Sequence, residues 1–104
     1  MKLLTKAILA KLPPLRSQDG KGLDAIAQVK FFNPTGIGTW YATEFDPQTG
    51  MFFGLADIHE KELGYFSLEE LSNFRGRFGL KIERDLYFKP VPLKELYNVS
   101  RSAA

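Results

Sequence analysis

The clearest hydrophobic pattern lies in the middle of the chain, where short runs of aromatic and aliphatic residues alternate with turn residues. Residues 38–45 and 51–57 form two such runs, joined by a link that contains Pro47 and Gly50. Proline near the start and glycine at the end of a five-residue link are typical of a β-hairpin. Residues 63–66 predict a third strand. Together these segments predict an antiparallel meander with a central hairpin.

Both hairpin strands carry large side chains on both faces. In the first strand, one predicted face holds Trp40, Ala42 and Glu44, and the other holds Tyr41, Thr43 and Phe45. A sheet with one solvated face would alternate more cleanly between apolar and polar residues. We therefore expect helices to cover one face and to cover the other in part. The pattern leaves open whether Trp40 and Tyr41 point into the core or line a groove.

Elements flanking the meander are predicted from capping residues and prolines. Thr5 can cap a helix that runs to Leu12 and ends before Pro13. Residues 27–32 alternate like a strand, and Ser67 begins a capping box that opens a second helix. Residues 86–88 predict a short strand and residues 93–97 a final short helix.

The predicted fold class is therefore α+β. A small antiparallel sheet of three to five strands packs with short helices from both ends of the chain. At 104 residues, the chain has the length of a single domain. We expect its core to span about residues 3–97 and residues 98–104 to form a frayed tail.

Composition narrows the class of protein without naming an activity. The chain is 44% hydrophobic and 25% charged, with a net charge of +2, which are ordinary values for a globular protein. It has no cysteine, which excludes disulfides and thiol catalysis and fits a cytoplasmic location. No hydrophobic run reaches the length of a membrane span. We expect no membrane association.

Catalytic chemistry has little support in the sequence. His59 is the only histidine, and it lies beside two glutamates without the spacing of a known metal motif. An enzyme would need two carboxylates brought together to divide acid and base roles. The candidates for such a pair are Glu44, Glu62, Glu83 and Asp85. We predict no metal site, no cofactor and no catalytic residue, and an enzyme with a carboxylate-based site is kept as an alternative.

A binding surface is the favoured prediction. Residues 82–90 place four charges around apolar residues on a loop or an edge strand, which suits either a contact surface or an internal network of ion pairs. The predicted protein-binding residues are Trp40, Tyr41, Glu44, Glu62, Tyr65, Arg84, Asp85 and Tyr87.

Single-stranded nucleic acid is the alternative partner. Bases stack on aromatic rings while phosphates contact lysine or arginine. The predicted meander supplies the rings, and the basic residues assigned to this alternative are Lys30, Arg75, Arg77 and Lys81. The oligomeric state is predicted to be a monomer or a homodimer.

Several short segments of the sequence resemble a known family of small bacterial proteins. They include residues 3–5 with 12–15, residues 29–32, residues 40–44, residues 52–55, residues 62–68 and residues 83–88. The family is known as domain of unknown function 2958, and its members occur on plasmids and other mobile elements. The resemblance implies no activity. It implies a small cytoplasmic accessory protein of mobile genetic elements.

Overall fold

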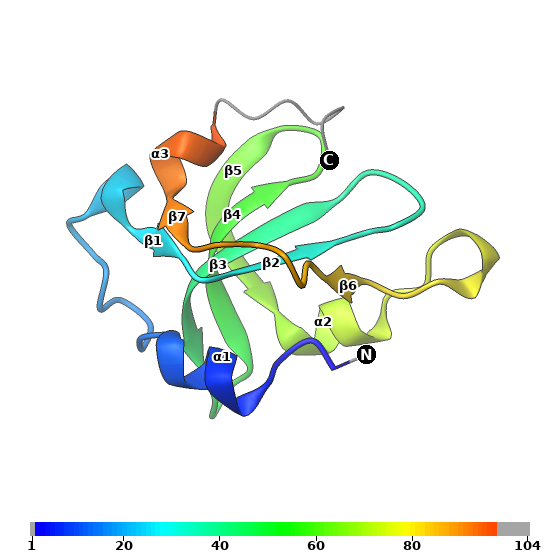
Figure 1. Cartoon of the computed structure of the whole chain (residues 1–104), viewed down its shortest axis with the longest axis horizontal. Helices are drawn as coiled ribbons and strands as arrows, with labels where there is room; N and C mark the ends of the chain where they lie inside the picture. The colour runs from blue at the N-terminus through cyan, green and yellow to red at the C-terminus, as the bar shows by residue number, and fades with distance from the viewer. Residues whose placement is uncertain (1, 98–104) are drawn as a thin grey trace.

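The computed structural model describes residues 2–97, so the predicted tail at residues 98–104 lies outside the described residues. Its main feature is a five-stranded antiparallel sheet in the order β5-β4-β3-β2-β6 (Figure 1). The strands are β2 (Val29–Phe32), β3 (Thr39–Asp46), β4 (Met51–Asp57), β5 (Lys61–Ser67) and β6 (Glu83–Arg84). The predicted α+β class and the predicted meander, β3 to β5, are confirmed.

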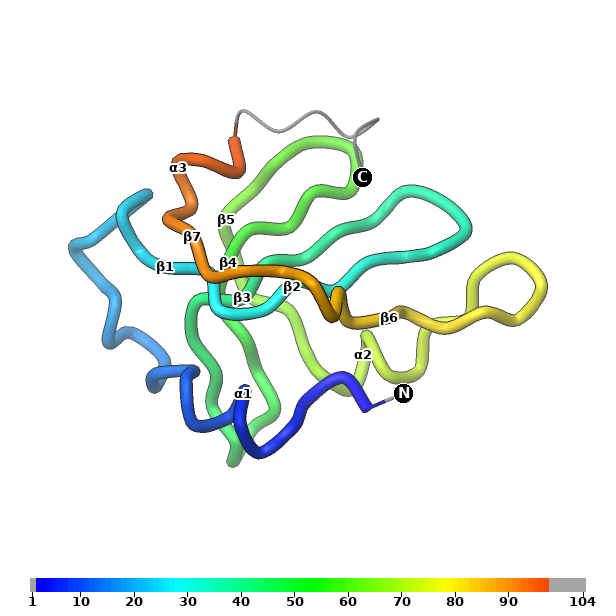
Figure 2. The backbone as a smooth tube through the Cα atoms, in the orientation of Figure 1, coloured from blue at the N-terminus to red at the C-terminus, as the bar shows by residue number. Residues whose placement is uncertain are grey.

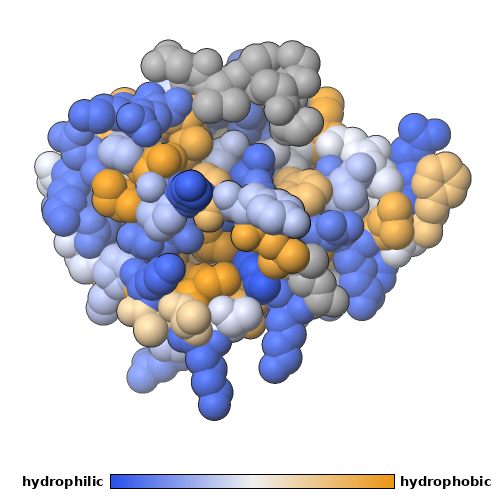
Figure 3. Space-filling view, viewed as in Figure 1, coloured by the Kyte–Doolittle hydropathy of each residue, from blue (hydrophilic) through white to orange (hydrophobic). Residues whose placement is uncertain are grey.

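A second, two-stranded sheet pairs β1 (Ile26–Ala27) with β7 (Val91–Pro92). The helices are α1 (Lys6–Lys11), α2 (Leu68–Asn73) and α3 (Leu93–Leu96), with short 3₁₀ turns η1 (Gly22–Asp24) and η2 (Arg77–Gly79). The chain from β6 to β7 runs beside β2 and crosses in front of the sheet (Figure 2). In the space-filling view, hydrophobic side chains gather near the centre of this face (Figure 3).

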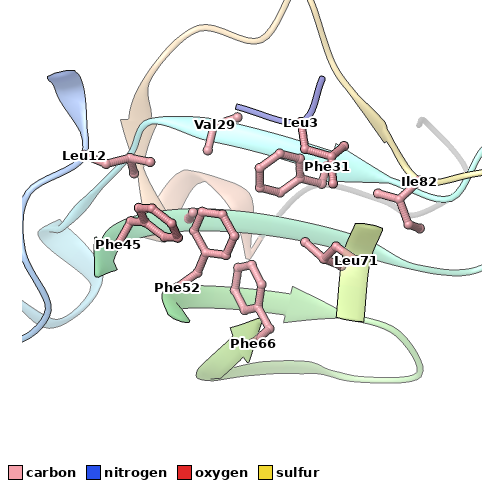
Figure 4. Packing of buried hydrophobic residues seen from close by; sticks show 10 residues of the cluster. Leu3, Leu12, Val29, Phe31, Phe45, Phe52, Phe66, Leu71 and Ile82 are labelled. Atoms are coloured by element: carbon pink, nitrogen blue, oxygen red, sulfur yellow. The ribbon is translucent and has the colours of Figure 1, made fainter. Parts of the chain in front are cut away.

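The sheet carries a hydrophobic cluster on each face. Neighbouring residues on a strand point to opposite faces, and adjacent Tyr41 and Ala42 belong to different clusters. The first cluster is built around Phe31 and Phe52, both fully buried, with rings 5.4 Å apart. Figure 4 shows how chain segments from outside the meander close over it. Those covering residues are Leu3, Leu12, Leu71 and Ile82.

The second cluster lies on the other face and is covered from the C-terminal side. Tyr41 and Leu55 contribute from the sheet, and Leu93 and Leu96 contribute from α3. Ala25 and Ala27, which lie around β1, complete the cluster. Helices therefore pack on both faces, whereas the hairpin pattern had predicted helices on one face and partial cover on the other.

A β-bulge in β3 changes the predicted facing of one aromatic residue. The register with β4 shifts between Ala42 and Glu44, so that two residues of β3 oppose one of β4. As a result Phe45 packs with Ala42 in the first cluster, where its ring lies 4.5 Å from that of Phe52. Simple alternation had predicted that Phe45 would share a face with Tyr41, and that prediction is wrong.

Two strand boundaries also differ from the prediction. The predicted strand at residues 27–32 is divided at Gln28 into β1 and β2, which belong to different sheets. Ala27 therefore packs in the second cluster, whereas Val29 packs in the first. The predicted strand at residues 86–88 is a turn, and the strand lies earlier, at β6. The backbone turns at Asp85, so β6 ends there.

The capping residues act as the sequence predicts. Thr5 Oγ1 accepts the backbone N–H of Ile8 at 3.2 Å, and Ser67 Oγ accepts that of Glu70 at 2.9 Å. Each bond satisfies one donor that a helix start otherwise leaves without an intrahelical partner. In the hairpin link, Gly50 adopts φ +74° and donates its N–H to the Asp46 carbonyl at 2.8 Å. The left-handed angle explains the glycine at this position.

Candidate functional site

Asp85 fixes the turn that follows β6. Its Oδ1 accepts the backbone N–H of Tyr87 at 2.9 Å, and its own N–H donates to the carbonyl of Lys30 at 2.9 Å. The Lys30 ammonium lies 3.7 Å from Oδ2 of the same carboxylate. Both the backbone and the side chain therefore anchor this turn to β2. A carboxylate that accepts the N–H two residues ahead is a standard way of holding a turn.

The anchored turn presents Leu86 and Tyr87 to solvent. Leu86 is 60% exposed and Tyr87 is 90% exposed. Phe88 turns inward instead, and its ring centre lies 5.8 Å from that of Tyr41. Single exposed apolar residues are common, but two adjacent large ones on a constrained turn make this turn a candidate contact site.

A cavity of about 240 Å³ lies between this turn and α1. Ile8 and Lys11 line it from the helix, Arg84 lines it from β6, and Leu86 lines it from the turn. Arg84 also donates a hydrogen bond to the backbone carbonyl of Lys2, which ties the N-terminal segment to β6. We call Leu86, Tyr87 and this cavity the Tyr87 surface. Leu86 and Tyr87 belong to the segment between β6 and β7, which crosses in front of the sheet (Figure 1).

A second exposed feature is the loop at residues 75–81, which we call the basic loop. It extends away from the body of the molecule after α2 (Figure 1). Arg75, Arg77 and Lys81 are all exposed on it, and Phe78 is 89% exposed. The guanidinium of Arg77 lies 5.8 Å from the centre of the Phe78 ring. Three of the four residues predicted for nucleic-acid binding are therefore brought together here.

Three of the predicted binding residues are partly or fully buried in the interior of the protein. Trp40 is half-buried against the first cluster, and Tyr41 is buried in the second. Glu44 is only 2% exposed, and its carboxylate accepts backbone N–H groups from the loop after α1. Burial raises the pKa of the Tyr41 phenol, and the nearby carboxylates of Asp57 and Asp85 raise it further.

The predicted residues Glu62 and Tyr65 lie on β5, at the opposite edge of the sheet from β6. Tyr65 is 59% exposed, and its ring packs edge-on against Phe53 with centres 5.0 Å apart. Arg84, Asp85 and Tyr87 lie together at the β6 edge. The predicted set is therefore divided between two edges and does not form one surface.

The carboxylates considered for catalysis are also dispersed. Glu62 is on one edge strand, Asp85 follows the other, and Glu44 is occupied by backbone donors. Glu83 is half-buried in β6. His59 is exposed beside a shallow cavity. Within residues 2–97, no three histidine, aspartate or glutamate side chains come close enough to hold a metal ion.

Sequence reasoning missed two exposed features. Phe78 was passed over, although its position between Arg77 and Gly79 in a glycine-containing segment indicates an aromatic residue outside the core. The other feature is a largely apolar cavity of about 590 Å³ between α1 and the β3–β4 hairpin. Leu9 could have indicated it, because this apolar residue lies outside the helix face formed by Leu4, Ile8 and Leu12, and it is 41% exposed. Its lining residues are Leu9, Leu12, Pro14, Leu15, Phe45, Asp46 and Pro47.

Fold and surface together define a small α+β protein with exposed aromatic residues on the Tyr87 surface and on the basic loop. None of the helices between residues 2 and 97 is long and apolar enough to cross a membrane. The family model described as "Protein of unknown function (DUF2958)" matches residues 3–103. The chain belongs to this family. No curated protein and no solved structure matched the chain.

Proposed function

We infer that this protein acts as a protein-binding module and that the Tyr87 surface is its contact site. The observation that carries the proposal is the 90% exposure of Tyr87 on a turn that Asp85 and Lys30 hold in place. As the family resemblance implies, we propose that it works as a cytoplasmic accessory protein of mobile genetic elements.

Rigidity supports a binding role for this turn. Ordering a loop and its side chains on association costs free energy, so an anchor that is already ordered binds more tightly. Here Asp85 holds the backbone of Tyr87, and Phe88 is packed against Tyr41 directly behind it. Tyrosine is enriched among residues that dominate binding energy, because it combines a large apolar ring with a hydroxyl.

Charge indicates the chemistry of the partner. Lys11 and Arg84 line the cavity beside Leu86, and Lys89 is exposed two residues after Tyr87. Asp85 offsets part of this positive charge and is itself paired with Lys30. A matching partner would present an apolar pocket for Tyr87 with acidic residues at its rim, since complementary charges speed association and fix orientation.

Site-specific crosslinking tests the proposal. A photoreactive amino acid placed at position 87 should trap a protein partner in host cells, and the same group at position 65 should not. Tyr65 is a suitable comparison because it is also an exposed tyrosine, at the far edge of the sheet.

Point variants then test whether the trapped protein is a specific partner. Tyr87→Ala and Leu86→Ala should each weaken binding of the purified partner by about tenfold or more, whereas Tyr65→Ala should leave it unchanged. Equal affinity for the native protein and Tyr87→Ala would exclude this surface as the contact site.

A further inference from the structure

We propose that the basic loop is a separate binding site for single-stranded nucleic acid, in which a base stacks on Phe78 and phosphates contact Arg77, Lys81 and Lys2. The proposal is independent of protein binding at the Tyr87 surface. It rests on the shape of the loop, on the exposure of its aromatic residue and on the charges around it.

The loop is closed and anchored. The N–H of Gly76 donates to the carbonyl of Leu80 at 2.7 Å, which brings the two ends of the tip together. At its base, Gly76 is pressed against the turn that follows β2, where an added Cβ would meet Thr35 Oγ1 at 2.7 Å. Arg75 donates to the carbonyls of Ser72 and Phe74 and so holds the end of α2. The tip is therefore presented on an ordered base.

Phe78 occupies a position that folding alone does not explain. Its backbone φ is +60°, in the left-handed region that costs a non-glycine residue about 1 kcal/mol or more. Its ring is 89% exposed, so burial of the side chain does not offset that cost. Gly79, which follows it, also has positive φ, and glycine adopts this conformation freely. A strained backbone that displays an exposed aromatic ring supports a contact role for Phe78.

The charges on the loop and at its foot are positive. Arg77 lies beside Phe78, and exposed Lys81 follows in the loop. Lys81 and Lys2 both line a cavity of about 330 Å³ at the foot of the loop. The acidic residues of α2, Glu69 and Glu70, are in its first turn, at the end away from the loop. A nucleic-acid backbone could thus run from Arg77 to Lys2 past cationic side chains.

A single exposed ring on a loop with cationic side chains fits a nucleobase better than a membrane. Stacking on one aromatic ring contributes substantially to single-strand binding, and every base offers a face for it. Membrane insertion depends on the apolar area buried, and in this loop Leu80 is the only other large apolar residue. Leu80 is also 45% exposed, so anionic vesicles are included in the test below.

The experiment measures fluorescence anisotropy of a labelled oligothymidylate of about 20 nucleotides, which exceeds the site size of a small domain. The native protein should bind it, with affinity falling as salt rises. Phe78→Ala and Phe78→Leu should each weaken binding by about fivefold or more, because leucine keeps an apolar group but cannot stack. Phe78→Trp should restore it.

Removal of one phosphate contact should change the salt dependence of binding. Arg77→Gln should lower the slope of log affinity against log salt by about 0.7, the value expected for one phosphate of a single strand. Tyr65→Ala should leave both affinity and slope unchanged, since that residue is exposed on β5 instead. Matching thermal unfolding curves for all the variants would show that they fold alike.

Three outcomes would overturn the proposal. The first is the absence of oligonucleotide binding at low salt. The second is an affinity that Phe78→Ala leaves unchanged. The third is binding to vesicles of phosphatidylcholine and phosphatidylserine that Phe78→Leu retains, together with no binding to the oligonucleotide, which would identify a membrane contact.

Discussion

The carboxylate of Glu44 accepts the backbone N–H of Arg16 at 2.8 Å, across 28 positions of sequence. Its other oxygen accepts the N–H of Gln18 at 2.7 Å. These two bonds explain how an acidic residue can be almost fully buried in a central strand, because a buried carboxylate must be compensated by donors. They also fix the loop after α1, where Arg16 adopts φ +71°.

Glu44→Gln should therefore lower the free energy of unfolding by about 1–3 kcal/mol. The amide nitrogen that replaces one oxygen cannot accept a hydrogen bond, so the N–H of Arg16 or Gln18 loses its acceptor. Urea denaturation of the two proteins measures the difference. Glu62→Gln is the matched control, because Glu62 is exposed on β5, and it should change stability by less than about 0.5 kcal/mol.

The two glycines that face each other on β4 and β5 should respond oppositely to alanine. An added Cβ at Gly54 would lie 1.9 Å from the carbonyl oxygen of Tyr41, whereas one at Gly64 would meet nothing within 4 Å. Gly54→Ala should destabilise the protein by about 1–3 kcal/mol or more, because the β3 backbone must move.

Gly64→Ala should instead raise stability by about 0.5–1 kcal/mol, since alanine loses less conformational freedom than glycine on folding. Thermal unfolding of the pair distinguishes the two effects. Equal loss of stability in both variants would contradict the close approach of β4 to Tyr41.

The fold was predictable wherever a local pattern determines the structure. The hairpin was predictable from the turn residues at 46–50, and two helix starts were predictable from Thr5 and Ser67. All three features depend on a hydrogen bond to a residue nearby in the sequence. The bulge beside Glu44 was not predictable, and neither was the burial of this carboxylate. Its donors, the N–H groups of Arg16 and Gln18, are distant in sequence.

The pKa of Tyr41 predicts a specific loss of stability in alkali. Burial first, and then Asp57 and Asp85, raise the pKa of its phenol above the ordinary value of 10.0. The folded state thus holds this proton more tightly than the unfolded state does. The stability that this provides is complete below about pH 10 and is lost as pH rises from there through the folded-state pKa.

Tyr41→Phe removes this titration and should flatten the alkaline fall in stability. The difference in unfolding free energy between native protein and variant should stay constant up to about pH 9 and then shift against the native protein. Lysines also lose protons in alkali, but they do so in both proteins, so their effect cancels in the difference between the two unfolding free energies. Parallel stability curves through the alkaline range would show that Tyr41 titrates normally.

Ser67→Ala should cost about 1 kcal/mol, because it removes the hydroxyl that accepts the N–H of Glu70 at the start of α2. Ser72→Ala is the control within the same helix. Ser72 is exposed in the last turn, where alanine is a better helix former than serine. That variant should be neutral or slightly stabilising in a denaturant titration.

The candidate site was predictable in part. Residues 82–90 had suggested either a contact surface or a network of ion pairs. The structure shows an ion pair between Asp85 and Lys30 and an exposed Tyr87, and contact with a partner is a proposal. The separation of Tyr65 from Tyr87 could not be foreseen, because it follows from the order of strands in the sheet. A pairing between segments about 50 residues apart, such as β2 with β6, leaves no local pattern.

The covering of the second cluster by α3 has a consequence for the protein while it is being made. The strands that contribute Tyr41 and Leu55 precede β7 and α3 in the chain, so a ribosome releases them first. Until Leu93 and Leu96 have emerged, that face of the nascent sheet lacks part of its apolar cover. Exposed apolar strands of this kind aggregate or recruit chaperones. A truncated chain that stops before β7 should therefore accumulate in the insoluble fraction more than the chain that includes α3.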